Sequence, residues 1–447
     1  MKTDTGTGSN KDISSAIEYI NSFQFHGFRL GLERMDAVLS ALGMPHKRYP
    51  VIHVAGSNGK GSTCATISSI LTTAGYRCGF YSSPHLFRLN ERFQINGSNI
   101  PDQELADLIF RIRKLVEAGY ALSYFEYTTA IAFTWFAAQN VDLAILETGL
   151  GGRLDATNVV NSPLMSIITT VSLEHQHWLG DTVGEIAWEK AGIIKPERPV
   201  ITCVKEPEAA KVISNRASKL GAPLYSLGRD FSMEKDRDNG LRFRFREHTM
   251  PGLTPGLPGR HQEANAAAAL ASVSLLREQG FEIEESQIRA GLSQTSWPCR
   301  CELLSRRPYI LIDGAHNREG LHALAEYIKK LSDITPFSHC SLLWACSNEG
   351  GDKPFLELLG IVGPLFHTVT ITEPPGPRSP VTVRQWERAM AENISSEGQD
   401  VTLTENWERA LYDALEHIEQ DGLLVVAGSL YLAGAVREKL VNEMRIK

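Results

Sequence analysis

Long apolar runs are missing from this sequence of 447 residues, and their absence narrows the class of protein. No stretch approaches the roughly 20 apolar residues that a membrane-spanning helix requires. Residues 1–10 are polar and contain neither the apolar core of a secretory signal nor an arginine-rich import pattern. The hydrophobic fraction of 43% and the charged fraction of 22% are typical of soluble globular proteins. We expect a cytoplasmic protein that does not associate with membranes.

An excess of positive charge is also missing. Lys and Arg together number 45 and Asp and Glu 52, which gives a formal net charge of −7. Such a chain has no general attraction for a phosphate backbone, so we expect no nucleic-acid partner. The seven cysteines are scattered, and only Cys299 and Cys301 lie close together. We therefore expect reduced thiols rather than disulfides or a zinc site.

What the sequence does contain is a regular alternation of β-branched runs and helical periods, which predicts mostly parallel sheets covered by helices on both faces. The length exceeds that of one ordinary core and predicts two or three domains. Strands are expected near 51–55, 78–82, 142–147, 165–170 and 200–204. Helices are expected near 63–74, 126–139 and 182–191.

The pattern changes near 291–298, where we place a domain boundary. Before it, the alternation over 241–246 predicts a hairpin or an edge strand, and an alanine-rich helix begins near Ala264. After it, strands are expected near 309–313, 342–346, 369–371 and 423–427. Helices are expected near 320–331, 381–391 and 407–416. We thus predict an α/β protein: a P-loop-type, mostly parallel sheet domain over 1–294, followed by a smaller Rossmann-like α/β domain over 295–447.

The strongest local signal is Val54-Ala-Gly-Ser-Asn-Gly-Lys-Gly-Ser-Thr63, a glycine-rich turn between a strand and a helix. Its glycines let backbone N–H groups approach phosphate oxygens, and the helix N-terminus adds partial positive charge. The spacing departs from the common P-loop, because only two residues separate the first two glycines and another glycine follows the lysine. The alternative is a turn without a ligand. We predict nucleotide contacts from Asn58, Gly59, Lys60, Gly61 and Ser62, with Ser62 also placed to reach Mg²⁺.

Three further polar residues follow strands or lie on a helix nearby. Glu147 ends an apolar strand at its carboxyl edge, where open α/β sheets place ligands, and a carboxylate there suits Mg²⁺. From the pattern alone, a loop histidine such as His175 is more often a solvated surface group, and Lys190 is more often an ordinary exposed lysine.

Eight segments, in order along nearly the whole chain, resemble the folate branch of the Mur ligase superfamily, the dihydrofolate and folylpolyglutamate synthases. The glycine-rich turn is one of them. The others are Gly31-Leu-Glu-Arg-Met35, Ser82-Ser-Pro-His-Leu86 with Glu91-Arg-Phe-Gln-Ile-Asn-Gly97, Tyr124-Phe-Glu-Tyr-Thr-Thr129, Glu147-Thr-Gly-Leu-Gly-Gly-Arg-Leu-Asp-Ala-Thr-Asn158, Trp188-Glu-Lys-Ala-Gly-Ile193, Asp313-Gly-Ala-His-Asn317 and Ala427-Gly-Ser-Leu430.

This resemblance implies two Mg²⁺ ions. Ser83, Glu147 and His175 match residues that hold the second ion in the family. Lys190 matches a lysine that carries a CO₂-derived carbamate in relatives, and we take it, with Lys60 and His316, as a catalytic residue. Glu174 stands where the family usually has Asp, a change that we expect to matter little.

The resemblance also assigns ATP contacts to the second half of the chain, at Asn265, Arg300 and Asp313. From the pattern alone, Asn265 is equally a helix-capping residue. Cys299 stands where the family usually has Gly, which changes the local turn beside Arg300. His316 and Asn317 match residues on the glutamate and phosphate side, and a plain loop is the alternative for both.

The implied pterin site uses residues from three segments, and Phe125 among them can either stack on a flat ring or pack in the core. The predicted substrate residues are Phe28, Arg29, Leu30, Leu122, Phe125, Arg153, Asp155 and Asn317.

The implied activity is an ATP-dependent ligase, acting as a monomer, that adds L-glutamate to dihydropteroate, to reduced folates or to both. An acyl phosphate is the intermediate, ADP and phosphate are released, and closure of two domains excludes water. The glycine-rich turn begins at Gly56, which leaves too little chain for the extra N-terminal domain usual in cell-wall Mur ligases. The alternatives are a Mur-type ligase with another acceptor and a non-ligase P-loop protein. Glu147, His175, Lys190, Arg300 and Asp313 argue against the latter.

Overall fold

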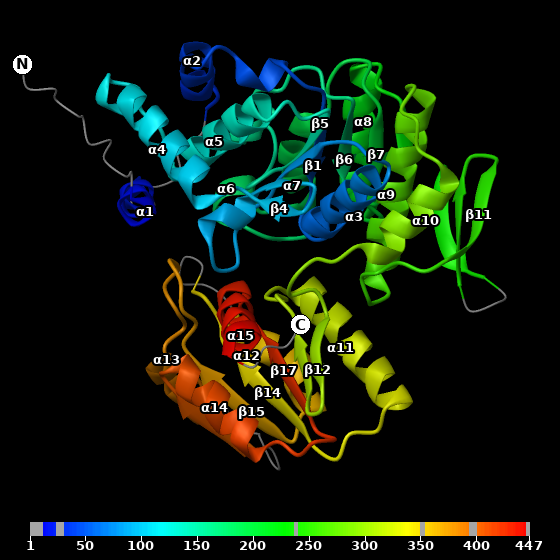
Figure 1. The fold of residues 1–447 in the computed structure, drawn as a ribbon. Helices are drawn as coiled ribbons and strands as arrows, with labels where there is room; N and C mark the ends of the chain where they lie inside the picture. The colour runs from blue at the N-terminus through cyan, green and yellow to red at the C-terminus, as the bar shows by residue number, and fades with distance from the viewer. Residues whose placement is uncertain (1–11, 24–30, 237–239, 349–353, 393–399, 444–447) are drawn as a thin grey trace, which may run out of the picture. The chain divides into compact units, whose positions relative to one another are not determined.

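The computed structural model of the chain describes residues 12–23, 31–236, 240–348, 354–392 and 400–443. It confirms the α/β class and forms two compact units (Figure 1). Unit 1 comprises Met1–Asp230 and Leu270–Gly291, and unit 2 comprises Phe231–Ala269 and Leu292–Lys447. The domain limits at 294 and 295 stay a prediction. No helix in these described ranges is long and apolar enough to cross a membrane.

The core of unit 1 is an eight-stranded sheet in the order β4-β3-β2-β5-β1-β6-β7-β8. All neighbouring strands are parallel except at the edge, where β3 pairs antiparallel with both β2 and β4. All five residues of the central strand β1 are buried, as expected for a parallel strand with helices on both faces. The strands are β1 Val51–Ala55, β2 Cys78–Tyr81, β3 Phe93–Ile95, β4 Ser98–Asn99, β5 Leu143–Glu147, β6 Met165–Ile168, β7 Val200–Thr202 and β8 Leu224–Ser226.

Helices cover both faces of this sheet. Side chains alternate along a strand, so Val51 and Ala55 face one side, where they join apolar clusters with residues of α5 and α7. Helix α3 contacts β1, β2 and β5. The helices that begin before residue 295 are α1 Ile13–Asn21, α2 Glu33–Ala41, α3 Lys60–Thr73, α4 Asp102–Glu117, α5 Tyr124–Ala138, α6 Gln176–Leu179, α7 Val183–Lys190, α8 Pro207–Lys219, α9 His261–Glu278 and α10 Glu285–Gln294.

A separate antiparallel sheet of three strands, β9 Phe231–Lys235, β10 Leu241–Phe245 and β11 His248–Leu253, confirms the expected hairpin. The alternation in β10 buries Phe243 and Phe245, whereas Arg242 is exposed.

The larger sheet of unit 2 has six strands in the order β12-β13-β17-β14-β15-β16, and only the β12–β13 pair is antiparallel. Its strands are β12 Glu302–Arg306, β13 Tyr309–Ile312, β14 Cys340–Trp344, β15 Thr368–Thr372, β16 Asp400–Thr404 and β17 Leu423–Ala427. Its helices are α11 Arg318–Ile334, α12 Phe355–Val362, α13 Val383–Glu392, α14 Trp407–His417 and α15 Leu430–Glu443. Parallel strands bring their carboxyl ends to one edge, which places the loop after β13 at a ligand-binding edge.

Candidate active site

The glycine-rich turn links β1 directly to α3, and its backbone takes conformations that favour glycine. Gly59 precedes the helix with φ 84°, and Gly56 has φ 153°. A Cβ atom at Gly56 would lie 1.9 Å from Thr169 Oγ1, so no larger side chain fits there. The turn is therefore a tight backbone cradle at a helix N-terminus, as a phosphate site requires.

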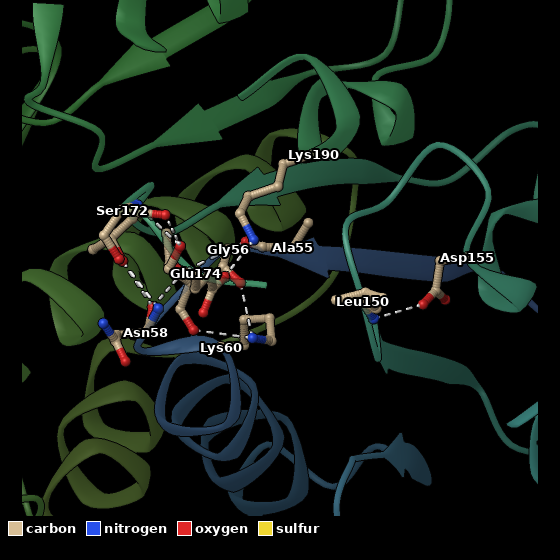
Figure 2. A network of polar contacts seen from close by, with 12 residues as sticks. Ala55, Gly56, Asn58, Lys60, Leu150, Asp155, Ser172, Glu174 and Lys190 are labelled. Carbon is tan, nitrogen blue, oxygen red and sulfur yellow. Dashed lines mark hydrogen bonds and ion pairs between the residues drawn. The ribbon is translucent and has the colours of Figure 1, made fainter. Parts of the chain in front are cut away.

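The segment after β6 holds this cradle in place. Thr169 Oγ1 donates to Asn58 O at 2.6 Å, and Asn58 N donates to Thr170 Oγ1 at 3.0 Å. Ser172 N donates to Ser57 Oγ at 3.0 Å. These contacts tie the loop to the segment that follows a neighbouring strand (Figure 2).

Lys60 folds back over the turn that precedes it. Its Nζ donates to Gly56 O at 2.8 Å and to Ser57 O at 3.1 Å. Its charge also lowers the pKa of both Glu174 and Lys190. Three of the residues that sequence analysis discussed thus lie within electrostatic reach of one another (Figure 2).

Lys190 is the last residue of α7 and is almost wholly buried, so it is not an ordinary surface lysine. Its Nζ donates to Glu174 Oε1 at 2.8 Å. Burial lowers the pKa of Lys190, and Lys60 lowers it further, whereas Glu174 raises it. Burial alone would raise the pKa of Glu174, but the charges of Lys190 and Lys60 lower it to about 2. The pair is a buried ion pair beside the cradle.

Three predicted oxygen ligands of Mg²⁺ lie on neighbouring elements. Glu147 ends β5 opposite Val54 of β1, and its Oε2 accepts from Ser83 N at 3.4 Å. Ser62 is buried in the first turn of α3, and the charges of Glu147 and Lys60 both act on Cys64 of the same helix. A carboxylate with hydroxyl oxygens fits Mg²⁺, which keeps several waters and binds phosphate oxygens as well.

His175, the fourth predicted ligand, precedes α6 with φ 48° and lies near enough to Glu174 to lower its pKa. No group of three or more His, Cys, Asp or Glu side chains in the described residues is arranged to hold a metal by itself. The predicted set contains only two such side chains, and its role as a metal site stays a prediction.

The loop after β5 is organised by Asp155, whose carboxylate is buried. Its Oδ2 accepts from Gly149 N at 2.8 Å and Leu150 N at 3.0 Å. Its Oδ1 accepts from Thr157 N at 3.0 Å and Thr157 Oγ1 at 2.5 Å. Burial raises the pKa of Asp155, and these hydrogen bonds oppose the rise. Asp155 therefore shapes the loop, and its contact with substrate stays a prediction.

The chain of contacts from Asp155 continues to a buried histidine that sequence analysis did not single out. Burial and the charge of Lys195 lower the pKa of His53 to about 3, so the ring is neutral. Its Nε2 lies 2.8 Å from Thr157 Oγ1, which already donates to Asp155. His53 Nε2 therefore donates, and three buried side chains form one hydrogen-bonded series.

The other predicted pterin residues have mixed surroundings. Phe125 is partly buried, and a Cβ atom at Gly149 would lie 2.6 Å from its ring. Arg153 Nη2 lies 3.0 Å from Glu189 Oε1, and its guanidinium lies 4.5 Å from the centre of the Trp188 ring. Leu122 is buried. Phe28, Arg29 and Leu30 lie outside the described residues.

Unit 2 brings Arg300 and Asp313 close to one strand end. Asp313 follows β13, and its carboxylate accepts from Cys301 N at 2.6 Å and Ala315 N at 2.7 Å. Arg300 Nη1 donates to Cys299 O at 3.1 Å. Cys299 and Cys301 have φ values of 57° and 46°, so the turn keeps the left-handed backbone that a glycine favours although cysteines occupy it.

His316 and Asn317 continue the same loop. His316 Nδ1 lies 2.8 Å from Gly314 O, which assigns the ring proton to Nδ1 when the ring is neutral. Asn317 Oδ1 accepts from Gly320 N at 2.9 Å and caps α11. Asn317 thus has a structural function, and its predicted substrate contact is untested.

Asn265 lies on the first turns of α9, where its Nδ2 donates to Gln262 Oε1 at 2.8 Å. His261 lies four residues earlier, and burial lowers its pKa while the charges of Asp313 and Arg300 act in opposite directions. Sequence analysis missed His261. The i, i+4 spacing with Asn265 is the signal that points to it, because such residues share a helix face.

Comparison with known proteins gives a consistent result. Residues 54–273 match the Mur ligase middle domain. The chain is 35% identical over 429 residues to the dihydrofolate synthase/folylpolyglutamate synthase of Bacillus subtilis, covering 93% of this chain and 96% of that protein. Its fold matches Escherichia coli FolC in complex with DHPP and ADP, at TM-score 0.84 and 31% identity, covering 97% of this chain and 98% of that one. A Yersinia pestis bifunctional folylpolyglutamate synthase/dihydrofolate synthase complexed with AMPPNP and Mn ion matches at TM-score 0.83 and 29% identity, covering 96% and 98%.

Proposed function

Because the chain belongs to the dihydrofolate synthase/folylpolyglutamate synthase family of Mur ligases, we propose that it adds L-glutamate to dihydropteroate, to reduced folates or to both. It is an ATP-dependent, amide-forming ligase that releases ADP and phosphate. The observation that carries this assignment is similarity over almost the full length of both chains, with the phosphate cradle complete between β1 and α3.

The chemistry follows from the poor leaving group of a carboxylate. The γ-phosphorus of ATP forms a bond to a carboxylate oxygen of the acceptor while its bond to the ADP oxygen breaks, giving an acyl phosphate. The amine of glutamate then attacks the carbonyl carbon and loses a proton. The C–O bond to phosphate breaks, which leaves the amide. Such transfer depends on positioning and on stabilising charge at the phosphoryl oxygens.

In unit 1, the backbone N–H groups from Asn58 to Gly61 bind phosphate oxygens, and Lys60 exchanges its two carbonyl contacts for the β- and γ-phosphates. Ser62, Ser83, Glu147 and His175 would hold Mg²⁺, which supplies a positive charge that neutralises the phosphates. We propose two such ions. The buried position of Glu147 and its contact with Ser83 support this set.

Lys190 is the residue whose chemistry depends most on its surroundings. Only a neutral amine adds to CO₂, and burial favours the neutral form. We propose that the Lys190 amine attacks CO₂ and releases a proton, so that a carbamate anion replaces the cation beside Glu174. That change of sign would place an anion near the second Mg²⁺.

In unit 2, we propose that Asn265, Arg300 and Asp313 contact the nucleotide and that His316 and Asn317 contact the glutamate. His316 carries its proton on Nδ1, so Nε2 of the neutral ring can accept the proton that the amine loses. Its hydrogen bond to Gly314 O supports that role by fixing the ring.

Phosphate release from ATP tests the proposed function with the full-length protein and Mg²⁺. Release that needs both glutamate and dihydropteroate identifies the synthase for the first addition. Release that needs glutamate and tetrahydrofolate identifies chain extension. Release that needs neither acceptor would contradict both synthase activities. The chain would then be a Mur-type ligase with a different acceptor or a non-ligase P-loop protein.

A further inference from the structure

Arg92 is a buried cation close to the candidate site. It ends the 3₁₀ helix Leu89–Arg92, just before β3, and only 6% of the residue is exposed. Its Nε donates to His85 Nδ1 at 2.9 Å, and its guanidinium carbon lies 5.5 Å from the centre of the Tyr124 ring. Two aromatic side chains thus hold the guanidinium in a fixed orientation.

Neither of these contacts supplies a negative charge. The imidazole of His85 is not an anion, and its Nδ1 only accepts the hydrogen bond from Arg92 Nε. The carboxylate of Glu91 accepts from the amides of residues 86–88. Asp102 accepts from Arg88 and Asn90. Among the residues that the structure describes, Arg92 has no carboxylate partner.

An uncompensated buried charge is unfavourable, since an ion loses its hydration when it is buried. Tyr124, whose ring faces the guanidinium, adds a second polar group, because its hydroxyl is buried and has no hydrogen-bond partner in the described chain. A guanidinium with unused N–H donors, packed against a ring whose hydroxyl is unpaired, suits an anionic oxygen group that arrives with a ligand.

The position of Arg92 connects it to the residues already described. Arg92 O accepts from Ser82 N at 3.0 Å, and the next residue, Ser83, lies beside Glu147. The charge of Arg92 also acts on Tyr81, whose ring lies 6.0 Å from the ring of Phe125. Arg92 is therefore hydrogen-bonded to the segment that carries Ser83, and the Tyr124 ring against its guanidinium belongs to the residue before Phe125, a predicted pterin residue.

We propose that Arg92 and the Tyr124 hydroxyl bind a carboxylate of the pterin-containing acceptor. This inference rests on the proposed function and adds a substrate-binding residue to it. The carboxylate has two possible sources: the group that becomes activated, which dihydropteroate and reduced folates share, and the second carboxylate of the glutamyl tail, which only reduced folates have.

The experiment measures steady-state KM values with the full-length protein for dihydropteroate, tetrahydrofolate, ATP and glutamate. Arg92→Gln is expected to raise the acceptor KM roughly 30- to 1,000-fold, because a buried charge contact is lost. Arg92→Lys retains the charge and is expected to recover part of the loss. Tyr124→Phe is expected to raise the same KM roughly tenfold. Arg88→Gln, the same change at an exposed neighbour, is the matched control and leaves every KM unchanged.

The pattern of KM values decides between the two sources. Equal increases for dihydropteroate and tetrahydrofolate identify the activated carboxylate, whereas an increase for tetrahydrofolate alone identifies the glutamyl tail. Acceptor KM values within twofold of the wild type in folded Arg92→Gln and Tyr124→Phe proteins would overturn the inference.

Measurements of Tm distinguish a structural role of the two residues from a role in substrate binding. Tyr124→Phe removes a hydroxyl that has no partner, so a structural role predicts an unchanged KM and an unchanged or higher Tm. A lower ADP affinity and a lower Tm in Arg92→Gln, together with a higher KM for all four substrates, would likewise overturn the inference. If the wild-type protein shows no acceptor-dependent phosphate release, the proposed function fails instead.

Discussion

Lys190 Nζ and Glu174 Oε1 lie 2.8 Å apart, and only 2% and 15% of the two side chains are exposed. The pair joins the end of α7 to the segment after β6, which also anchors the phosphate cradle. Glu174 was expected to be an unimportant substitution for Asp. In the structure its carboxylate is the ion-pair partner of Lys190 and opposes the fall in the Lys190 pKa that burial causes.

Glu174→Gln tests the contribution of this pair to stability. The pKa of Glu174 is about 2, below its ordinary value of 4.5, so its ionised form stabilises the folded protein above pH 4.5. That contribution is lost as pH falls from about 4.5 to about 2. In CO₂-free buffer, where Lys190 is not carbamylated, the variant should lose this part of the acid dependence and, at pH 7, about 3 kcal/mol of unfolding free energy, because a buried ammonium loses its carboxylate partner.

Urea unfolding at several pH values measures both effects. Glu117→Gln breaks an exposed pair with Arg113 and serves as the control, with an expected change below about 0.5 kcal/mol. Equal losses in the two variants would contradict the importance of the buried pair.

Lys190→Ala tests the proposed carbamate. The variant should lose activity by about 100-fold, since it removes a preorganised charge from the site. In the wild type, removal of dissolved CO₂ should lower activity and bicarbonate should restore it. Because the pKa of Lys190 is lowered, carbamate formation should increase with pH at lower values than for an exposed lysine.

A ¹³C NMR signal after addition of labelled bicarbonate measures the carbamate directly. Lys219→Ala, at an exposed lysine of α8, should leave the signal and the activity intact. Undiminished activity in Lys190→Ala would refute the proposal.

Gly56→Ala should abolish nucleotide binding, because its Cβ atom would overlap Thr169 Oγ1 and displace the cradle. Gly75→Ala is the control, because it introduces a side chain at a positive φ without a clash. Gly75 has φ 89°, and a Cβ atom there meets nothing within 4 Å. We expect Gly75→Ala to cost about 1 kcal/mol of stability and to bind ADP normally. Titration with ADP and Mg²⁺ measures both variants, and normal ADP affinity in Gly56→Ala would contradict the expectation.

Thr157→Val tests the buried series from His53 to Asp155. It removes the hydroxyl between them and should lower the unfolding free energy by about 1–3 kcal/mol, because two buried polar groups lose a partner. If Asp155 also contacts substrate, the KM for dihydropteroate should rise more than that for ATP. Thr134→Val removes only a bond to Ala130 O within α5, and should cost less. Equal losses of stability in the two variants would show that the series contributes no more than one hydrogen bond within a helix.

The parallel strands were predictable from the sequence because burial on both faces produces short, continuous apolar runs. The expected strand over 51–55 is β1, and that over 423–427 is β17. The amphipathic helices α4 and α8 were not assigned, because their mixed polar surfaces give weaker signals. The start of α3 was placed three residues late, since Gly61 lies inside its first turn.

The cradle was predictable because all its parts lie within ten consecutive residues. The contact between Glu174 and Lys190 was not, because it depends on how a loop folds back on a helix sixteen residues later. Arg92 was equally hidden, since its sequence neighbours are polar and give no sign that its guanidinium is buried.

All seven cysteines are free and buried. Burial raises the pKa of six of them, at positions 64, 78, 203, 299, 301 and 340, which keeps those thiols protonated. Thiol reagents react with accessible thiolates, so the native protein should label slowly. Dyes can therefore be attached to introduced cysteines without first removing the native ones. Cysteines introduced at the exposed Lys114 of α4 and Glu416 of α14 can carry a donor and an acceptor dye, one on each unit, and report their separation as ATP and glutamate bind.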